Sequence, residues 1–486
     1  IGPDFYGTGQ ATLFDEEEMR RVNVFDWDDD VKGFGKIMKH GGFDCVIGNP
    51  PYVRQELLKE QKEYFKAHYR VYQGTADLYA YFIERGVSLL SSKGLFSIIV
   101  ANKWMRANYG KQLRQWLKTK RVEEFVDFGD LSVFKNTTTY PCIMRISNGK
   151  PRSTFGVTKV ETLEFPTLEA YVKEHQYAVS QDELVDSGWS LVDEQTQALL
   201  NKLRKTGIPL GEYVPDKIYR GVLTGLNEAF VIDSSICDKL IAEDPKSAEL
   251  IKPFLAGKDI KRYQPPQSDK YLIFTRRGVN IREYPAIESY LKQFKEKLMP
   301  KPENWNKEKW PGRKPGNYKW YEIQDSIDYY LEFEKPKILV PDISMQGNFT
   351  MDSEGKCYCV NTAYIISKGD RYLLGILNSN LITFFYKSIA STYRGGYLRF
   401  IYQYMVELPI RTIDFSNPTE KVQHDKLVAL VDNILELQKK YHEARMERDK
   451  ELYERQIKIV DAQIDRLVYD LYGLTEEEVK VVEGAF

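Results

Sequence analysis

Residues 43–52 read Phe43-Asp44-Cys45-Val46-Ile47-Gly48-Asn49-Pro50-Pro51-Tyr52, a short apolar run followed by a turn with two prolines. The apolar residues 45–47 predict the end of a buried strand, which stops at Gly48. Two consecutive prolines continue neither a helix nor a strand ladder, so we expect a rigid, extended turn after the strand. We call residues 49–52 the proline corner.

The proline corner offers an unusual set of polar groups. Asn49 carries a side-chain acceptor and a donor, Pro50 offers a carbonyl without an N–H, and Tyr52 adds a flat ring. An amide oxygen and a fixed carbonyl can together accept both hydrogens of an exocyclic amino group, which turns its nitrogen lone pair outward. The corner therefore predicts a site for a planar group with an NH2. A chance surface turn is the alternative reading of so short a motif.

Length and composition limit the class of protein. The chain has 486 residues, which predicts two or three domains, and no apolar run reaches the roughly 20 residues of a membrane helix. The net charge is −1, so any surface for nucleic acid must be local. The five cysteines are scattered without metal-site spacing, so we expect no metal and a cytoplasmic protein.

Helical and strand patterns alternate in the first 150 residues. Apolar runs predict strands at 21–27, 45–49, 95–100, 124–128 and 140–146. Helical periodicity predicts helices at 33–41, 76–92 and 108–120, with a further helical spacing of charges in 54–72. This alternation predicts an α/β unit with a mostly parallel sheet that helices cover on both faces.

The later chain has a different composition. We expect a connecting segment at 151–205, a mixed α+β domain at 206–415 and a helical region at 416–486. Residues 292–321 interleave lysines with tryptophans and tyrosines, the most basic local surface of the chain. Residues 419–472 contain no Gly or Pro and carry two apolar stripes, which predict two long helices or one helix broken near 443–450. The stripes could pack on their own domain or on another chain.

Taken together, these segments resemble the gamma class of adenine-specific DNA methyltransferases. More closely, they resemble type IIG restriction–modification proteins with a TaqI-like C-terminal specificity domain. The resemblance lies in Asp26-Trp27 (motif III), Asn49-Pro50-Pro51-Tyr52 (motif IV), Asp77-Leu78-Tyr79 with Phe82 (motif V) and Asp130-Leu131-Ser132-Val133-Phe134 (motif VIII). It continues in two signature turns of the specificity domain, Arg220-Gly221-Val222-Leu223-Thr224-Gly225-Leu226-Asn227 and Leu255-Ala256-Gly257-Lys258-Asp259-Ile260-Lys261-Arg262.

The resemblance implies a fold and a separate function for each of two regions. Residues 1–150 would form the second half of a Rossmann-like methyltransferase domain, and residues 206–415 would recognise the DNA target. The chain begins with Ile1 and opens without the glycine-rich motif I of this family. We therefore expect a piece of a longer protein, with an incomplete cofactor site and no activity of its own. The final helices could contact another subunit or the missing N-terminal region.

The resemblance also implies roles for individual residues. S-adenosylmethionine would be the cofactor, and the target would be adenine N6 of a base turned out of double-stranded DNA. The catalytic residues would be Asn49, Pro50, Pro51 and Tyr52; the cofactor-binding residues Asp26, Trp27 and Phe82; and the base-stacking residues Tyr52 and Phe134. DNA contacts would come from Arg220, Thr224, Lys258 and Arg262, and the local composition adds Arg313, Lys314 and Arg394.

Two other functions remain open from the sequence. The same four-residue motif occurs in enzymes that methylate a glutamine amide of release factors and in some ribosomal RNA guanine methyltransferases. The long chain after Tyr52, with its basic and aromatic turns, favours DNA over these substrates. A non-enzymatic DNA-binding or subunit-contact module is the second alternative.

Overall fold

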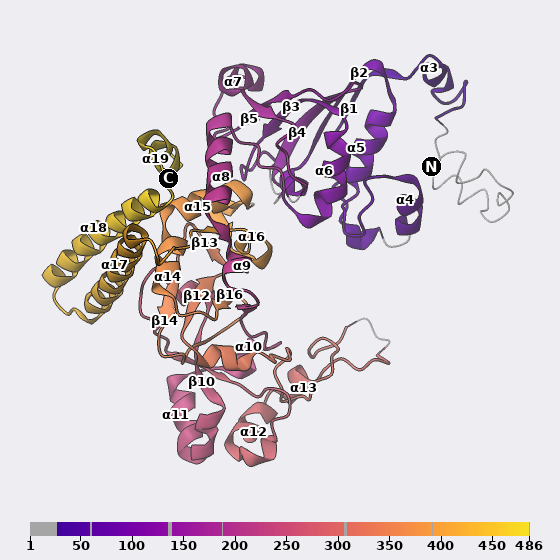
Figure 1. Cartoon of the computed structure of the whole chain (residues 1–486). Coiled ribbons are helices and arrows are strands. Elements are labelled where there is room, and N and C mark those ends of the chain that lie inside the picture. Colours follow the sequence, from indigo (N-terminus) through magenta and orange to yellow (C-terminus); the bar gives the residue numbers. More distant parts are fainter. Residues whose placement is uncertain are drawn as a thin grey trace. The chain divides into compact units, whose positions relative to one another are not determined.

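The computed structural model describes residues 27–58, 61–134, 139–186, 188–305, 309–390 and 392–485, without the side chains of 392–394. The chain divides into two compact units, Ile1–Gln197 and Ala198–Phe486. Figure 1 colours the first unit indigo to magenta and the second magenta to yellow. Helix α8 (Glu194–Thr206) spans the division.

The first unit is built on a six-stranded sheet of order β1-β2-β4-β3-β5-β6. Its strands are β1 (Phe43–Gly48), β2 (Leu90–Ala101), β3 (Arg121–Asp127), β4 (Pro141–Ser147), β5 (Thr154–Lys159) and β6 (Tyr177–Ser180). The pairs β1/β2 and β3/β5 are parallel, whereas β2/β4, β3/β4 and β5/β6 are antiparallel. Four of the six strands (β1, β2, β3 and β5) therefore run in one direction, as a mostly parallel sheet predicts, whereas β4 and β6 run against them. The described residues between β3 and β4 form turns, so the chain returns antiparallel and enters between β2 and β3.

Helices accompany this sheet. Three lie where the apolar periodicity predicts them: α3 (Gly35–Lys39), α5 (Tyr79–Ser88) and α6 (Lys111–Lys118). Helix α4 (Lys62–His68) lies in the segment with helical spacing of charges, and α7 (Leu168–His175) lies where we expected only a connecting segment. Helix α5 buries Tyr81, Ile83 and Val87 and packs against β2. In the core the Trp104 ring meets the Phe125 ring at 6.0 Å and the Trp189 ring at 5.4 Å between centroids.

Strand β1 differs from the buried strand that its apolar sequence predicts. Within the described sheet it has β2 as its only neighbour. Side chains alternate along a strand, so Val46 packs on the core while Cys45 and Ile47 face the other way. Cys45 is exposed, and Ile47 is 81% exposed. Cys45 and Ile47 thus lie on a face of β1 that no other element in the described part of the chain covers.

The first unit also extends past residue 150, where we expected a connecting segment. Strands β5 and β6 add to the sheet, and α7 lies between them in the sequence. Trp189 belongs to the same hydrophobic core. Residues 151–189 therefore pack with the sheet instead of only linking two domains.

The second unit contains several small sheets, as the mixed α+β pattern predicts. Their orders are β15-β10-β11-β9, β14-β12-β16-β8, β13-β18-β17 and β19-β7. The strands are β7 (Ile208–Pro209), β8 (Ile218–Arg220), β9 (Val231–Asp233), β10 (Ile251–Leu255), β11 (Lys270–Ile273), β12 (Lys337–Pro341), β13 (Ile343–Ser344), β14 (Thr350–Asp352), β15 (Tyr358–Cys359), β16 (Ala363–Ile366), β17 (Thr392–Tyr393), β18 (Tyr397–Arg399) and β19 (Pro409–Ile410). The helices among them are α9 (Leu210–Tyr213), α10 (Asn227–Phe230), α11 (Ser234–Glu243), α12 (Pro285–Lys292), α13 (Lys295–Leu298), α14 (Arg371–Asn378), α15 (Asn380–Ile389) and α16 (Tyr402–Met405).

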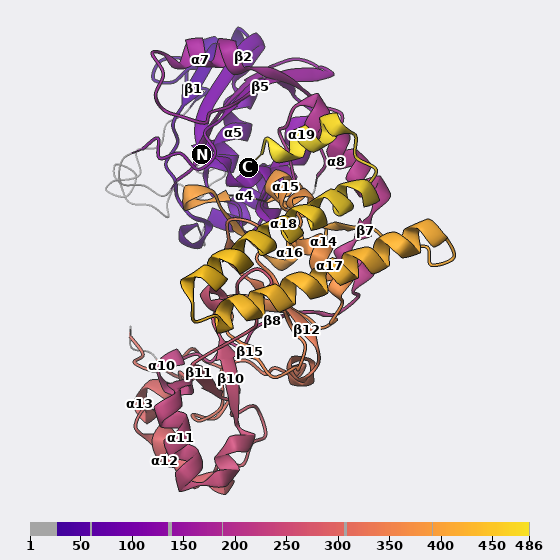
Figure 2. The same ribbon diagram turned by 90° about the vertical axis from the view of Figure 1, so that its left-hand side faces the viewer.

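Three helices close the second unit: α17 (Pro418–Glu443), α18 (Glu447–Leu471) and α19 (Glu476–Glu483). Helices α17 and α18 lie side by side in both views (Figures 1 and 2), and the break between them falls inside the expected 443–450. The apolar stripe of α17 is buried, and Leu427 and Val431 lie against Gly375 of α14. A Cβ built on Gly375 would lie 2.9 Å from Val431 Cγ2. The stripe thus packs within its own unit.

Among the described residues, no helix combines the length and the apolar character that crossing a membrane requires.

Candidate active site

The proline corner lies at the surface, directly after β1. Asn49 is exposed, Pro50 is buried, and Tyr52 is 37% exposed. The Tyr52 hydroxyl donates a long hydrogen bond of 3.5 Å to the Ile99 carbonyl of β2, and partial burial raises the pKa of this phenol. The buried proline anchors the turn while the Asn49 amide stays available to a ligand.

The start of α5 holds the chain that leaves the corner. The Leu78 N–H donates to the Val53 carbonyl (3.1 Å), and the Gln55 N–H donates to Asp77 Oδ1 (3.2 Å). Burial raises the pKa of the Asp77 carboxyl. Phe82 follows one helical turn after Leu78 and is 44% exposed. The structure thus brings the segments that resemble motifs IV and V together, with an exposed ring beside them.

Strand direction gathers further polar groups at the same edge of the sheet. Strand β2 is parallel to β1, and both β2 and β3 are antiparallel to β4, so β1, β2 and β3 run in one direction. Their carboxyl ends therefore meet at one edge, where open α/β sheets bind ligands. Asn102 directly follows β2, and Asp127 is the last residue of β3. Phe134 lies in the segment after β3 and is half-buried.

The sequence reading missed Asn102 and Asp127. One Asn102 amide nitrogen, Nδ2, donates to Asp127 Oδ1 at 2.8 Å and to the Gly129 carbonyl at 3.0 Å. Asp127 Oδ1 also accepts the Gly129 N–H at 3.0 Å. The available signal was positional, because each is a polar residue at the carboxyl end of an apolar strand.

The structure does not bring Trp27 to the proline corner. Its ring contacts Phe34 (5.5 Å between centroids) and Phe43 (6.4 Å). Phe43 is the first residue of β1, whereas Asn49 follows the last, and a six-residue strand spans about 20 Å. Trp27 therefore lies at the opposite end of β1. Asp26 lies outside the described residues.

Three of the basic residues that we expected to contact DNA are exposed. They are Arg220 at the end of β8, Lys258 in the turn Gly257–Asp259, and Lys314. The Ala256 N–H donates to Asp259 Oδ2 (2.9 Å), which fixes the turn that carries Lys258. These three residues remain candidates for phosphate contact.

Two residues that we expected to contact DNA, Arg313 and Thr224, are buried, so the structure corrects this expectation. The Arg313 guanidinium donates to main-chain carbonyls, and Thr224 donates to Asn227 Oδ1 at 2.6 Å. The carbonyls around Arg313 belong to Leu298 (2.8 Å), Thr224 (3.0 Å), Glu322 (2.7 Å), Trp320 (2.9 Å) and Lys319 (3.3 Å). A guanidinium that is satisfied in this way holds loops together and has no donor to offer a phosphate.

The expectation that Arg262 contacts DNA is also corrected, because its side chain is engaged within the protein. Its guanidinium donates to the Gly347 carbonyl (3.2 Å), to the Asn378 carbonyl and to Asp461 Oδ1 of α18 (2.5 Å). Arg262 therefore ties a turn of the expected specificity domain to the C-terminal helices. The side chain of Arg394 lies outside the described part of the chain.

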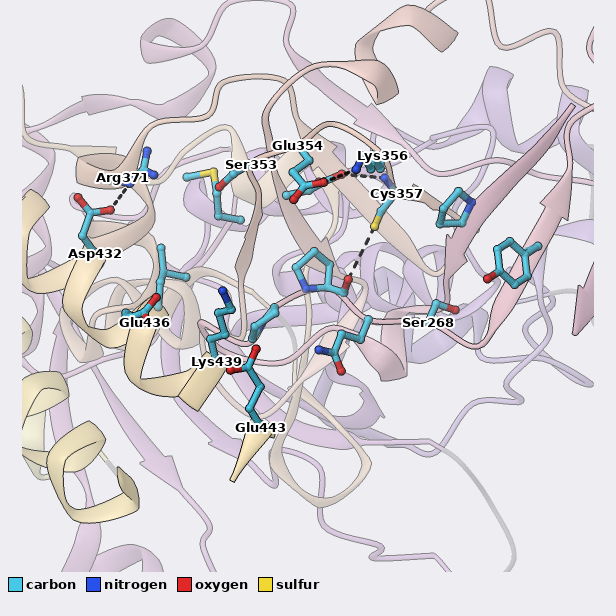
Figure 3. Close-up of a pocket in the computed structure, with 18 residues that line it drawn as sticks. Ser268, Ser353, Glu354, Lys356, Cys357, Arg371, Asp432, Glu436, Lys439 and Glu443 are labelled. Atoms are coloured by element: carbon cyan, nitrogen blue, oxygen red, sulfur yellow. Dashed lines mark hydrogen bonds and ion pairs between the residues drawn. The ribbon is translucent and has the colours of Figure 1, made fainter. Parts of the chain in front are cut away.

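A pocket of about 670 Å³ opens elsewhere in the second unit, between α17 and loops of the small sheets (Figure 3). Its wall includes two ion pairs, Arg371 with Asp432 and Lys356 with Glu354. None of the site residues expected from the sequence lines it. In the described ranges, no group of three His, Cys, Asp or Glu side chains could hold a metal ion.

Two family models match the chain. The Eco57I restriction-modification methylase matches residues 6–134, and the TaqI-like C-terminal specificity domain matches residues 252–410. They cover the proline corner and the turn with Lys258, respectively.

Several proteins are similar over most of the chain. Type II methyltransferase M.BstVI of Geobacillus stearothermophilus is 26% identical over 91% of this chain and 75% of its own length. M.PaeR7I of Pseudomonas aeruginosa is 28% identical over 91% and 73%. The restriction enzyme and methyltransferase RM.Eco57I of Escherichia coli is 22% identical over 97% of this chain, which spans 49% of that protein.

One solved structure shares the fold. The Type IIL restriction-modification enzyme MmeI, in complex with DNA, has a TM-score of 0.58 and 13% identity. The match covers 90% of this chain and 56% of the MmeI chain, so this chain spans about half of that enzyme.

The matches to family models and relatives identify the chain as a DNA methyltransferase of restriction–modification systems. More particularly, the chain belongs to the type II methyltransferases in which an Eco57I-type methylase region precedes a TaqI-like C-terminal specificity domain. The family that the sequence predicts is thus confirmed.

Asp465 of α18 lies beside the Arg262 contact and is itself buried. Its Oδ1 accepts the Asn380 N–H at 2.7 Å. Burial raises the pKa of this carboxyl to about 6; Arg262 opposes the rise, whereas Asp461 and Glu483 add to it. An unfolded aspartate titrates near 3.9, so the folded protein holds this proton to a higher pH.

We predict that Asp465 makes the free energy of unfolding fall as the pH rises from about 4 to about 6, by roughly 2–3 kcal/mol. The Asp465→Asn variant keeps an acceptor for Asn380 and has no charge to bury. It should match the wild type near pH 4 and exceed it above pH 6, in urea unfolding measured across this range. Glu454→Gln, at an exposed site of the same helix, is the control. An unchanged pH profile for Asp465→Asn would contradict the assignment.

Proposed function

We propose that this chain is the part of a type IIG restriction–modification protein that presents adenine N6 of a specific duplex DNA sequence for methyl transfer from S-adenosylmethionine, and that the chain is inactive without the rest of the cofactor site. The observation that carries the proposal is the proline corner, which presents an exposed amide and a half-exposed ring at the carboxyl edge of the sheet. The family supports DNA methyl transfer, and the corner suits an amino group on a planar base.

The corner would act on a base that has left the double helix. The amino group of a paired adenine lies inside the stack, so an enzyme that modifies it turns the nucleotide out. Asn49 Oδ1 and the Pro50 carbonyl would accept the two amino hydrogens and hold the nitrogen lone pair outward. The Pro51 carbonyl already accepts the Val53 N–H (3.0 Å), so Pro51 serves the turn itself. Catalysis would then rest on placement and fixed dipoles.

Two aromatic residues would hold the extruded base. Tyr52 follows the two acceptors directly, and Phe134 lies in the segment that leaves β3 at the same edge. Stacking on an aromatic side chain is worth roughly 1–3 kcal/mol per base. This amount offsets a good part of the free energy lost when the base leaves its neighbours in the duplex.

The described residues fit the proposed cofactor in part. S-adenosylmethionine, when bound, supplies an electron-poor methyl group. Phe82 offers it an exposed ring one helical turn after Leu78, whose N–H donates to the Val53 carbonyl, and the Asp77 contact fixes the start of that helix. Trp27 does not contribute to this wall in the structure, because it packs on Phe43 at the far end of β1.

The second unit would read the DNA. A specificity domain matches residues 252–410, and MmeI, which shares the fold, was solved in complex with DNA. Lys258, Arg220 and Lys314 are exposed cations of this unit. Such residues bind mainly phosphate and give affinity that depends on salt, whereas base edges specify the sequence.

We predict that Asn49→Ala, tested in the full-length protein, lowers kcat for methyl transfer to DNA by about 10²–10³-fold, the typical loss for one fixed polar contact. The Kd for DNA should stay close to the wild-type value, because the loss concerns the reacting amino group. Radiolabelled methyl transfer and DNA-binding titrations measure the two quantities. Cys45→Ser, at an exposed position of the same strand, is the control. Full activity of Asn49→Ala would overturn the proposal.

We also predict that Lys258→Ala weakens DNA binding and lowers the slope of log Kd against log salt by about 1, as for one lost phosphate contact. The effect should be similar for DNA with and without the target site. Fluorescence anisotropy at several salt concentrations measures it. Lys458→Ala removes an exposed lysine that pairs with Glu454 on α18 and should leave the slope unchanged. Equal slopes for the wild type and Lys258→Ala would exclude this contact.

A further inference from the structure

The link between Asn102 and Asp127 crosses the sheet at the point where a strand begins. Strand β4 lies between β2 and β3, and Cys142 pairs with both Val100 and Asp127. The first residue of β4 is Pro141, which has no N–H for a ladder bond. At this level of the sheet the side chain of Asn102, which directly follows β2, bonds to Asp127 at the end of β3 through a 2.8 Å hydrogen bond.

The same pair holds both ends of one loop. The segment between β3 and β4 starts at Phe128 and ends at Tyr140, and the structure describes its residues 128–134 and 139–140. At its start, Asp127 accepts the Gly129 N–H and Asn102 donates to the Gly129 carbonyl. At its end, the Asn102 main-chain N–H donates to the Tyr140 carbonyl at 2.8 Å. Asn102 is thus bonded to the departing and to the returning chain.

The proline corner contacts β2 close to the position of Asn102. Tyr52 donates to the carbonyl of Ile99 in β2, and Asn102, three residues later, directly follows the end of this strand. Ile99 directly precedes Val100, which pairs with Cys142 of β4. Cys142 pairs in turn with Asp127 of β3. The loop also carries Phe134. Asn102 and Asp127 therefore connect β2, which Tyr52 contacts, to the start of the segment that carries Phe134.

We propose that Asn102 and Asp127 are positioning residues, which set the loop with Phe134 at a fixed distance from the proline corner. This inference rests on the proposed function. The pair need not touch the base, because its effect passes through the Gly129 and Tyr140 main chain. A shift of about 1 Å in the position of a reacting group can cost about 100-fold in rate. Loss of the link should therefore lower kcat more than DNA affinity.

The first test compares single variants of the full-length protein. Asn102→Ala removes the link and should lower kcat by about 10- to 100-fold, with unchanged Kd for DNA. Asn148→Ala is a matched control, because its amide ties a turn at the opposite edge of the same sheet, to the Leu90 and Ser91 carbonyls (3.3 and 3.1 Å). A kcat loss for Asn102→Ala that comes with an equal loss for Asn148→Ala, or with weaker DNA binding, would overturn the proposal.

The second test exchanges the two side chains. Asn102→Asp places two carboxylates against each other and should be as defective as Asn102→Ala, because like charges repel. The double variant Asn102→Asp/Asp127→Asn restores one donor and one acceptor across the link and keeps an acceptor for the Gly129 N–H, but it loses the donor to the Gly129 carbonyl. It should recover part of kcat relative to Asn102→Asp. No recovery, with thermal midpoints equal to that of the wild type, would contradict a role through this bond.

A third readout needs no methyl transfer and separates this inference from the proposed function. Amide hydrogen exchange in peptides from residues 128–134 should be faster in Asn102→Ala than in the wild type and unchanged in Asn148→Ala. If the wild type transfers no methyl group, the proposed function fails while this result still supports the link. Equal exchange in all three proteins would show that the pair does not hold the loop.

Discussion

The site depends on one constraint, which is that two successive prolines end strand β1 in a stiff turn. Because Pro50 is buried and Pro51 accepts the Val53 N–H, the backbone of the corner has little freedom. Asn49 is therefore held in an exposed position at the surface. A polar amide with a fixed position is what an amino group needs, since electrostatic catalysis works through dipoles that do not have to reorganise.

Strand direction extends this constraint to the rest of the edge. Since β1, β2 and β3 run the same way, their ends deliver the corner, Asn102 and Asp127 to one side of the sheet. The antiparallel β4 lies between β2 and β3, and beside its first residue the Asn102 amide bonds across to Asp127 of β3. In the second unit, the buried Arg313 and the partly buried Arg262 have a related role. Arg313 joins five carbonyls of neighbouring loops, and Arg262 joins a turn to α18.

The sequence predicts the elements of the first unit better than their arrangement. Apolar periodicity gives the positions of α5 and β2, because burial of one face is a local pattern. It does not reveal that β4 is antiparallel, since pairing depends on where a loop returns. Nor does it show that Ile47 is exposed, because the residue type alone does not distinguish an isoleucine on an uncovered strand face from one in the core.

The same distinction applies to the site residues. The proline corner follows from four adjacent residues, so the sequence alone indicates it. Arg313 and Lys314 are neighbours with equal charge, yet one is buried and the other exposed. No local pattern separates them, because the carbonyls that hold Arg313 come from distant segments. Asn102 and Asp127 are 25 residues apart and meet only through the sheet.

The central claim is that the corner directs a methyl group to the amino nitrogen of adenine in DNA. The most direct measurement is mass spectrometry of nucleosides from duplex DNA that was incubated with the full-length protein and S-adenosylmethionine. The account predicts N6-methyladenine, confined to one sequence context when the DNA is mapped. A methylated cytosine, or methyl transfer to RNA or protein with none to DNA, would contradict it.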